Sequence, residues 1–67
     1  MKSPKEQHFK ATVGYEGKYE EFTFWIIGIS PDIEGDVRSE YKRLRASRGQ
    51  GWDGKKYEFI GCYPLES

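Results

Sequence analysis

The chain has 67 residues, enough for one small domain, and a domain of this size buries only about 60% of the surface that its unfolded chain exposes. Acidic and basic residues balance at 11 each, which excludes the overall basic excess on which general nucleic-acid and membrane-surface binders depend. Cys62 is the only cysteine, so an internal disulfide and a cysteine metal cluster are excluded, and a reducing, cytoplasmic location is favoured.

The first expected element follows a polar N-terminal segment. Residues 1–7 contain no apolar stretch, so we expect a flexible tail rather than a signal peptide, and one folded domain over residues 8–67. A strand begins at His8 or Phe9, and apolar and polar residues then alternate as far as Tyr15, which predicts one buried face. Glu16-Gly17 favours a tight hairpin turn, because glycine adopts positive φ without strain.

Residues 22–29 form the only long uncharged run of the chain, and their aromatic and β-branched side chains predict a second strand. We place its even-numbered residues under a helix with other apolar residues of the sheet, which gives the predicted core Ala11, Val13, Phe22, Phe24, Ile26, Tyr57 and Phe59. Trp25 and Ile27 then fall on the opposite, open face of the sheet, with Ile60. An exposed apolar patch of this kind usually marks an interaction site, unless the tail or Trp52 covers it.

A helix is expected after the second strand. Ser30-Pro31 predicts its start, because serine can cap the first amides and proline fits the first helical position. Its apolar face recurs at spacings of four, four and three residues, through Ile33, Val37, Tyr41 and Leu44. Acidic residues gather near its start and basic ones near its end, as the helix dipole favours. Glycines follow Arg48, so the helix is expected over residues 31–48.

A glycine-rich loop leads from the helix to a last strand over residues 57–63, which Pro64 ends. The sequence therefore predicts an α+β fold, a three-stranded and mostly antiparallel sheet with one helix packed on one face, in the order strand-strand-helix-strand. The last strand can lie antiparallel beside the first strand or parallel beside the second. We expect the antiparallel arrangement, because small sheets that face water on one side are usually antiparallel.

Few residues could support catalysis. His8 is the only histidine, and it approaches Cys62 if the first and last strands pair, which would resemble a thiol-imidazole pair. No pattern places the two in a pocket, so a surface histidine and a small apolar cysteine are the preferred interpretation. The loop from Gly49 to Gly54 lacks the lysine-serine or lysine-threonine pair of a phosphate-binding loop. We therefore expect no enzyme activity, no cofactor and no metal site.

Basic side chains and a second tryptophan form another candidate surface. Arg38, Lys42 and Arg45 follow one side of the helix, where they could meet phosphates or an acidic protein, although an ordinary solvated face is the simpler interpretation. Trp52 is a candidate interface anchor, or it folds over the sheet edge. The residues predicted to contact a partner are Trp25, Ile27, Arg38, Lys42, Arg45, Arg48, Trp52 and Lys55.

Several fold-determining residues resemble those of a known family: Phe9 with Ala11-Thr12-Val13 in the first strand, Phe22, Phe24 and Ile26 in the second, and Tyr57-Glu58 to Pro64 in the third. Over residues 9–64 the chain resembles the small phage-encoded inhibitors of bacterial RNA polymerase, which dock on the polymerase and stop host transcription. It departs from them in the last strand, where Gly61 and Tyr63 replace the arginines that grip the target, and its helix is more basic.

Three functional hypotheses follow. The first is a non-enzymatic protein-binding module, a phage-type inhibitor that docks on a larger host complex such as bacterial RNA polymerase or a defence nuclease. The second is a nucleic-acid binder that uses the basic helix, Lys55 and a base stacked on Trp52. The third is a homodimer joined through the open sheet face or an edge strand. No apolar run is long enough to span a membrane, so no membrane partner is expected.

Overall fold

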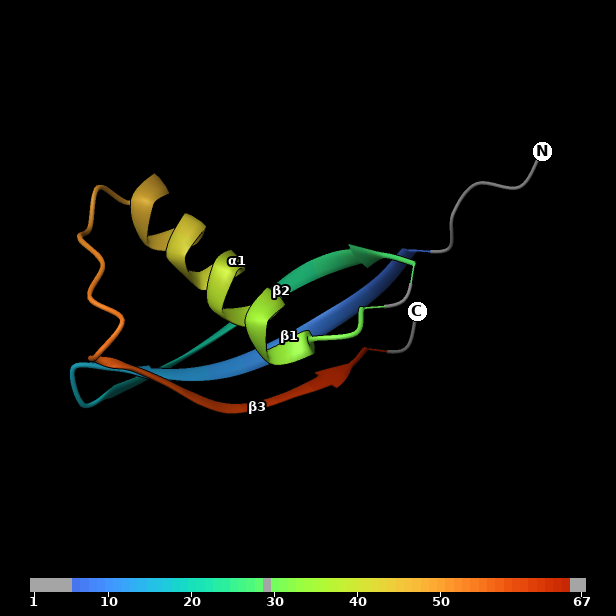
Figure 1. The fold of residues 1–67 in the computed structure, drawn as a ribbon, viewed down its shortest axis with the longest axis horizontal. Helices are drawn as coiled ribbons and strands as arrows, with labels where there is room; N and C mark the ends of the chain where they lie inside the picture. The colour runs from blue at the N-terminus through green and yellow to red at the C-terminus, as the bar shows by residue number, and fades with distance from the viewer. Residues whose placement is uncertain (1–5, 29, 66–67) are drawn as a thin grey trace.

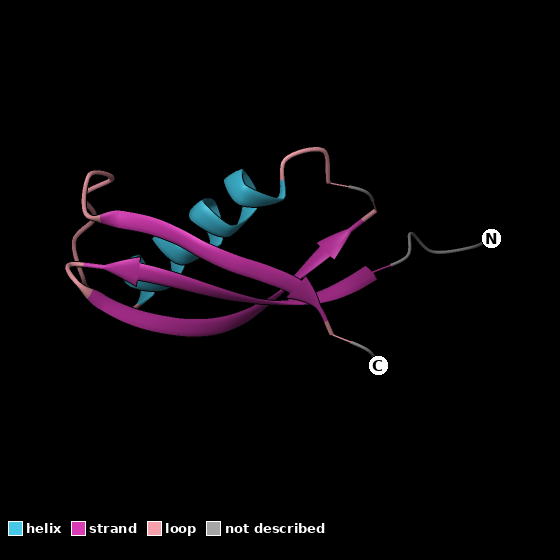
Figure 2. Ribbon diagram, turned by 90° about the horizontal axis from the view of Figure 1, so that it is seen from below, coloured by secondary structure: helices cyan, strands magenta, loops and turns pink. Residues whose placement is uncertain are grey.

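A computed structural model describes residues 6–28 and 30–65. It contains, in chain order, β1 (Glu6–Tyr15), β2 (Lys18–Ile27), α1 (Ile33–Ser47) and β3 (Tyr57–Pro64). The strands form one antiparallel sheet in the order β2-β1-β3, and α1 crosses one face of it (Figure 1). Viewed from below, the strands lie in front of the helix (Figure 2). The predicted α+β fold, the order of its elements and the antiparallel pairing of the last strand with the first are therefore confirmed.

The β1-β2 hairpin is regular along its whole length. Its pairs run from Glu6↔Ile27 to Tyr15↔Lys18 without a bulge. Glu16 and Gly17 have φ angles of 52° and 78°, the left-handed pair of a type I′ turn, whose twist matches that of the strands. The predicted hairpin is confirmed, but β1 begins at Glu6, so only residues 1–5 of the expected tail remain, and these lie outside the described residues.

The hydrophobic core lies between α1 and the sheet. Its buried members come from both layers and are Ala11, Val13, Tyr15, Phe24, Val37 and Tyr41. Partly buried side chains extend it along the same face, among them Phe22, Ile26, Tyr57 and Phe59. The predicted placement of the even-numbered β2 residues under the helix is confirmed. Each large apolar side chain that is fully buried contributes about 1.5–3 kcal/mol, so this face supplies most of the folding free energy.

The helix begins later than the sequence predicts. It covers Ile33–Ser47, not residues 31–48, and Asp32 is its N-cap. The Asp32 carboxylate accepts a hydrogen bond of 3.0 Å from the N–H of Gly35. The prediction of a Ser30-Pro31 start is therefore wrong, because aspartate caps a helix as well as serine does and here it stands nearer the first apolar residue. A side chain at Gly35 would collide with the capping carboxylate, which explains a glycine in the first turn.

A β-bulge in β3 changes which of its side chains point toward the core. Thr12 pairs with Gly61 and Val13 with Phe59, so Ile60 is an extra residue on the β3 side. Because a bulge interrupts the strict alternation of a strand, Phe59 and Cys62 both pack against the core. Ile60 itself is 46% exposed, as predicted for an uncovered residue.

Candidate protein-binding surface

The sheet face that points away from α1 carries large apolar side chains. Trp25 and Ile27 are 58% and 64% exposed, because they alternate with the core residues of β2. On β3, Tyr63 is 50% exposed, and its partner in register is Lys10 of the central strand. The predicted position of Trp25 and Ile27 on an uncovered face is confirmed. We call His8, Trp25, Ile27 and Tyr63 the open-face patch.

The central strand holds Trp25 in a fixed orientation. His8 lies opposite Trp25 in the hairpin register, and their rings stack with centroids 4.1 Å apart and planes 4° from parallel. Stacked aromatic pairs contribute about 0.5–1.5 kcal/mol beyond the area they bury. Trp25 is thus packed on His8 by one ring face and still exposes more than half of its surface, an arrangement that suits an interface anchor.

Polar groups lie beside the open-face patch. The ammonium of Lys10 and the carboxylate of Glu21 are 3.5 Å apart, with side chains 33% and 57% exposed. An exposed ion pair of this kind contributes at most about 1 kcal/mol to stability, so it can rearrange at low cost. Lys10 lies on the central strand, opposite Thr23 of β2 and Tyr63 of β3, so this face combines apolar side chains with a charged pair.

Trp52 lies on the other side of the sheet and is not an exposed anchor. Its ring centroid lies 5.7 Å from Tyr15, 6.2 Å from Tyr41 and 5.4 Å from Tyr57. The next residue, Asp53, donates its backbone N–H to the Tyr15 hydroxyl at 2.6 Å. Trp52 therefore fastens the loop to the core, as in the alternative in which it folds against the sheet, and it does not cover Trp25.

Most of the predicted basic stripe is engaged within the chain. The Arg45 guanidinium lies 3.7 Å from the centroid of the Tyr15 ring, and its Nε donates to the carbonyl of Gly51 at 2.8 Å. The Arg38 guanidinium lies 5.9 Å from the Trp52 ring. These two arginines hold the loop against the helix.

The remaining predicted cations differ from one another. Arg48 pairs with Glu20, with 2.6 Å between Nη1 and Oε2. Lys42 and Lys55 are exposed, and neither has an ion pair within the described residues. The structure therefore does not bring the predicted partner-binding residues together into one surface, because Arg38, Arg45 and Arg48 lie on α1 or at its end, on the opposite side of the sheet from the open-face patch (Figure 1).

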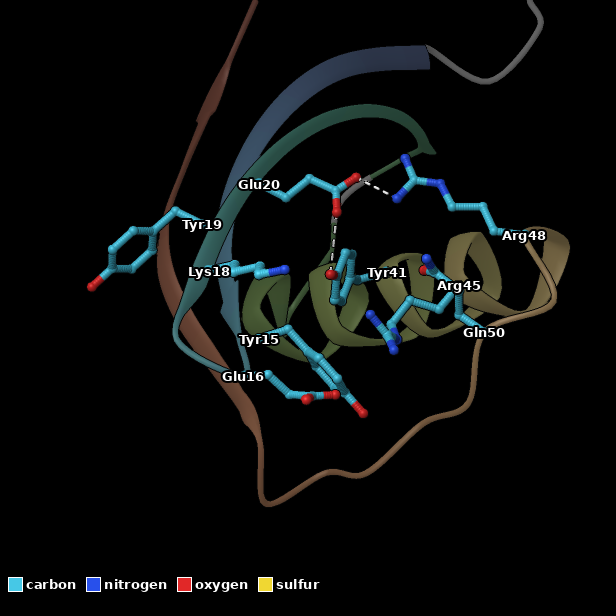
Figure 3. A pocket seen from close by; sticks show the side chains of 9 residues that line it. All are labelled: Tyr15, Glu16, Lys18, Tyr19, Glu20, Tyr41, Arg45, Arg48 and Gln50. Carbon is cyan, nitrogen blue, oxygen red and sulfur yellow. Dashed lines mark hydrogen bonds and ion pairs between the residues drawn. The ribbon is translucent and has the colours of Figure 1, made fainter.

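A cavity of about 520 Å³ lies between the hairpin end of β2 and the last turns of α1 (Figure 3). Lys18 and Arg45 reach toward the same space beside the Tyr41 ring, whereas Tyr19 points away from it (Figure 3). The negative charge of Glu20 is compensated within the chain, because its carboxylate accepts a 3.3 Å hydrogen bond from the Tyr41 hydroxyl and pairs with Arg48. Lys18 and Arg45 have no carboxylate partner among the described residues, but Glu16 also lines the cavity and Arg45 is already bonded to Gly51. The cavity therefore carries charges of both signs and does not select an anionic group.

The two candidate catalytic residues are separated by the sheet. Cys62 lies opposite Ala11 and packs against the core, whereas His8 stacks on Trp25 on the open face. The alternative in which His8 approaches Cys62 is therefore wrong, because the bulge in β3 turns the cysteine toward the helix, and the preferred interpretation of Cys62 as a small apolar residue agrees with its packing. Burial raises the pKa of the Cys62 thiol, which lowers its reactivity at neutral pH. Within residues 6–28 and 30–65, no three His, Cys, Asp or Glu side chains are grouped to hold a metal ion.

Comparison with known protein families, with curated proteins and with solved structures gives no match to this chain. The resemblance to phage inhibitors of RNA polymerase thus stays a prediction. In the part of the chain that the structure describes, no helix is long and apolar enough to cross a membrane.

Two members of the open-face patch were missing from the predicted site. The position of His8 could have been predicted from the turn, because a register fixed by the pair Tyr15↔Lys18 places His8 opposite Trp25. Tyr63 could not be found in this way, because strict alternation from Tyr57 and Phe59 would turn it toward the core, and only the bulge at Ile60 turns it outward.

Proposed function

We propose that this chain is a non-catalytic protein-binding module that docks on a larger protein through the open-face patch. The observation that supports the proposal is the exposure of Trp25, Ile27 and Tyr63 on a sheet face that the helix does not cover. The core on the helix side already accounts for folding, so these apolar side chains are free to be buried by a partner. The His8–Trp25 stack supports rigid docking.

The partner that we propose is a bacterial RNA polymerase, which the chain would inhibit in the cytoplasm of a phage-infected host. This identity rests on the resemblance of residues 9–64 to phage-encoded polymerase inhibitors. Where that family uses arginines in the last strand, this chain has Gly61 and the exposed Tyr63. Binding should therefore depend on apolar contact more than on charge, and its affinity should change little with salt concentration.

The test is a binding titration of purified bacterial RNA polymerase with the chain, combined with a transcription assay. Trp25→Ser should weaken binding at least about thirtyfold, because central aromatic anchors contribute about 2 kcal/mol or more. Lys42→Gln is the matched control, since Lys42 is exposed on the helix side and away from the patch. Absence of polymerase binding, together with no Trp25-dependent capture of any protein from bacterial lysate, would contradict the proposal.

The nucleic-acid alternative receives less support. Trp52, which would stack on a base, is packed among three tyrosine rings, and Arg45 is held on Tyr15. Of the predicted cations, Arg38, Lys42 and Lys55 are exposed without an ion pair in the described residues, and the Arg38 guanidinium lies 5.9 Å from the Trp52 ring. Steeply salt-dependent binding of a single-stranded oligonucleotide that Lys42→Glu abolishes would reverse this preference.

A further inference from the structure

The outer edge of β2 has unpaired backbone groups. The hairpin turn has two residues, so Tyr15 and Lys18 form a hydrogen-bonded pair, and every second pair along the ladder repeats it. The even-numbered residues of β2 therefore bond to β1. The odd-numbered residues direct N–H and C=O outward, and they are Tyr19, Glu21, Thr23, Trp25 and Ile27. Within the described residues, no backbone group outside the sheet bonds to them.

The half of this edge from Phe22 to Ile27 lacks the features that usually prevent strand addition, whereas the half next to the turn carries Lys18, Glu20 and Glu21. From Phe22 to Ile27, β2 has no proline, no charged residue and no bulge. The opposite edge, β3, has both a bulge at Ile60 and a proline at its end, Pro64. Proteins commonly protect edge strands with charges, prolines and bulges, and an unprotected edge is a template for another strand. The chemistry of the edge therefore selects an extended polypeptide as its occupant.

We propose that this occupant is a second copy of the chain. The β2 strands of the two copies pair antiparallel about a two-fold axis at Thr23, which joins two three-stranded sheets into one. In this register Tyr19 faces Ile27 of the second copy, and Glu21 faces its Trp25. Each of the outward residues then exchanges two hydrogen bonds with its counterpart.

The register at Thr23 is self-complementary. The most exposed large apolar side chains of β2, Tyr19 at 73% and Ile27 at 64%, cover one another across the axis. On the helix side, Phe22 lies opposite Phe24 of the second copy. A register centred on Glu21 would instead place two carboxylates face to face, which is destabilising, and registers centred on Phe22 or Phe24 pair fewer of the outward residues. The zero net charge of the chain removes any overall repulsion between the copies.

The dimer does not depend on the proposed function, because it is held by backbone hydrogen bonds along the edge of β2. It covers Ile27 of the open-face patch and leaves His8 and Tyr63, on the other two strands, uncovered. In a dimer of this symmetry both helices lie on one side of the joined sheet and both open-face patches on the other. The two Trp25 side chains then lie near the axis, and their patches form one larger surface.

The decisive experiment is sedimentation equilibrium of the full chain up to about 1 mM, with and without a substitution at Thr23. Thr23→Pro removes an outward N–H and leaves the ladder with β1 intact, so it should weaken dimerisation at least about a hundredfold. Thr23→Val keeps the N–H and the shape of the side chain, and it should dimerise as the wild-type chain does. Hydrogen exchange should slow at the amides of Glu21, Thr23 and Trp25 as concentration rises.

A second substitution guards against misfolding of the proline variant. Within one copy Thr23 lies opposite Lys10, so Thr23→Glu adds a favourable contact to the monomer. Across the axis the same change brings two carboxylates together, and dimerisation should weaken at least about tenfold at low salt and partly recover at high salt. A wild-type chain that stays monomeric to about 1 mM, or a dimer that Thr23→Glu leaves unchanged at low salt, would overturn the proposal.

Discussion

The two faces of the sheet use the same kinds of side chain for different purposes. On the helix side, Trp52 packs against three tyrosine rings, and Tyr41 is 2% exposed. On the other face, Trp25 has one aromatic neighbour, His8, and is 58% exposed. The difference teaches that an aromatic residue does not identify a binding site by its type, and that the position of its strand relative to the helix decides its role.

The same contrast applies to charged side chains. On the helix side, Arg45 is stacked on Tyr15 and bonded to Gly51, so it links three parts of the chain. On the open face, Lys10 and Glu21 form an exposed pair within the hairpin. Because the contacts that stabilise the fold are concentrated on one face, the other face can be changed without unfolding the protein.

The largest effect is expected for Tyr41→Ala. Tyr41 is the largest fully buried side chain, and its ring lies within about 6 Å of the rings of Tyr15, Phe22, Trp52 and Tyr57. Truncation of a buried aromatic residue costs about 3–5 kcal/mol, which approaches the whole stability of a small domain. Urea denaturation followed by circular dichroism should show a chain that is largely unfolded at 25 °C. A loss below about 1 kcal/mol would show that the core is not centred on this residue.

The two tryptophans provide a direct comparison of the faces. Trp52→Ala should destabilise the chain by about 2–4 kcal/mol, since the loop loses its attachment to the core. Trp25→Ala should cost about 1 kcal/mol or less, mainly the stack on His8, while it removes partner binding. Urea titrations of both variants measure the difference, and near-equal losses would contradict the assignment of Trp25 to binding and Trp52 to folding.

Much of the fold follows from local patterns in the sequence. The Glu16-Gly17 turn fixes the hairpin register, and the register together with side-chain alternation places Trp25 and Ile27 on the open face. Tertiary contacts were not accessible in this way. That Arg45 stacks on Tyr15 depends on how α1 lies across the sheet, and its hydrogen bond to Gly51 depends on the path of the loop after α1; no periodicity encodes either. The side of the sheet on which Tyr63 lies depends on the bulge at Ile60, which no sequence pattern signals.

A smaller effect is expected on the helix surface, where two cations one turn apart differ in their contacts. Arg45→Met should cost about 1–2 kcal/mol, because it removes the stack on Tyr15 and the hydrogen bond to Gly51. Lys42→Met should change stability by less than about 0.5 kcal/mol, because Lys42 is exposed and has no ion pair in the described part of the chain. Thermal unfolding at matched salt distinguishes the two. Equal effects would mean that Arg45 acts only as a surface charge.

Alkaline pH should weaken the fold through Cys62, which packs against the core on the helix side. Burial raises the pKa of the Cys62 thiol above its usual 9.0, so the folded chain holds this proton more tightly than the unfolded chain does. Its contribution to stability is present below pH 9.0 and is lost as the pH rises through the raised value. Urea midpoints at pH 7 and at pH 10 should therefore differ less for Cys62→Ala than for the wild-type chain. An unchanged difference would show that the thiol does not titrate with folding.

The smallest effect is expected for Tyr57→Phe. Burial, with a further contribution from Glu34 and an opposing one from Arg38, raises the pKa of the Tyr57 hydroxyl above 10.0. The hydroxyl oxygen is buried and has no hydrogen-bond partner among the described residues. Its removal should leave the free energy of unfolding at pH 7 unchanged or raise it by up to about 1 kcal/mol. The substitution removes a buried polar group and breaks no hydrogen bond. The variant should also lose less stability above pH 10.0 than the wild-type chain, since the phenol no longer ionises on unfolding. A clear loss of stability at pH 7 would instead show that the hydroxyl makes a bond in solution, and that the helix side of the sheet has a polar contact at its centre.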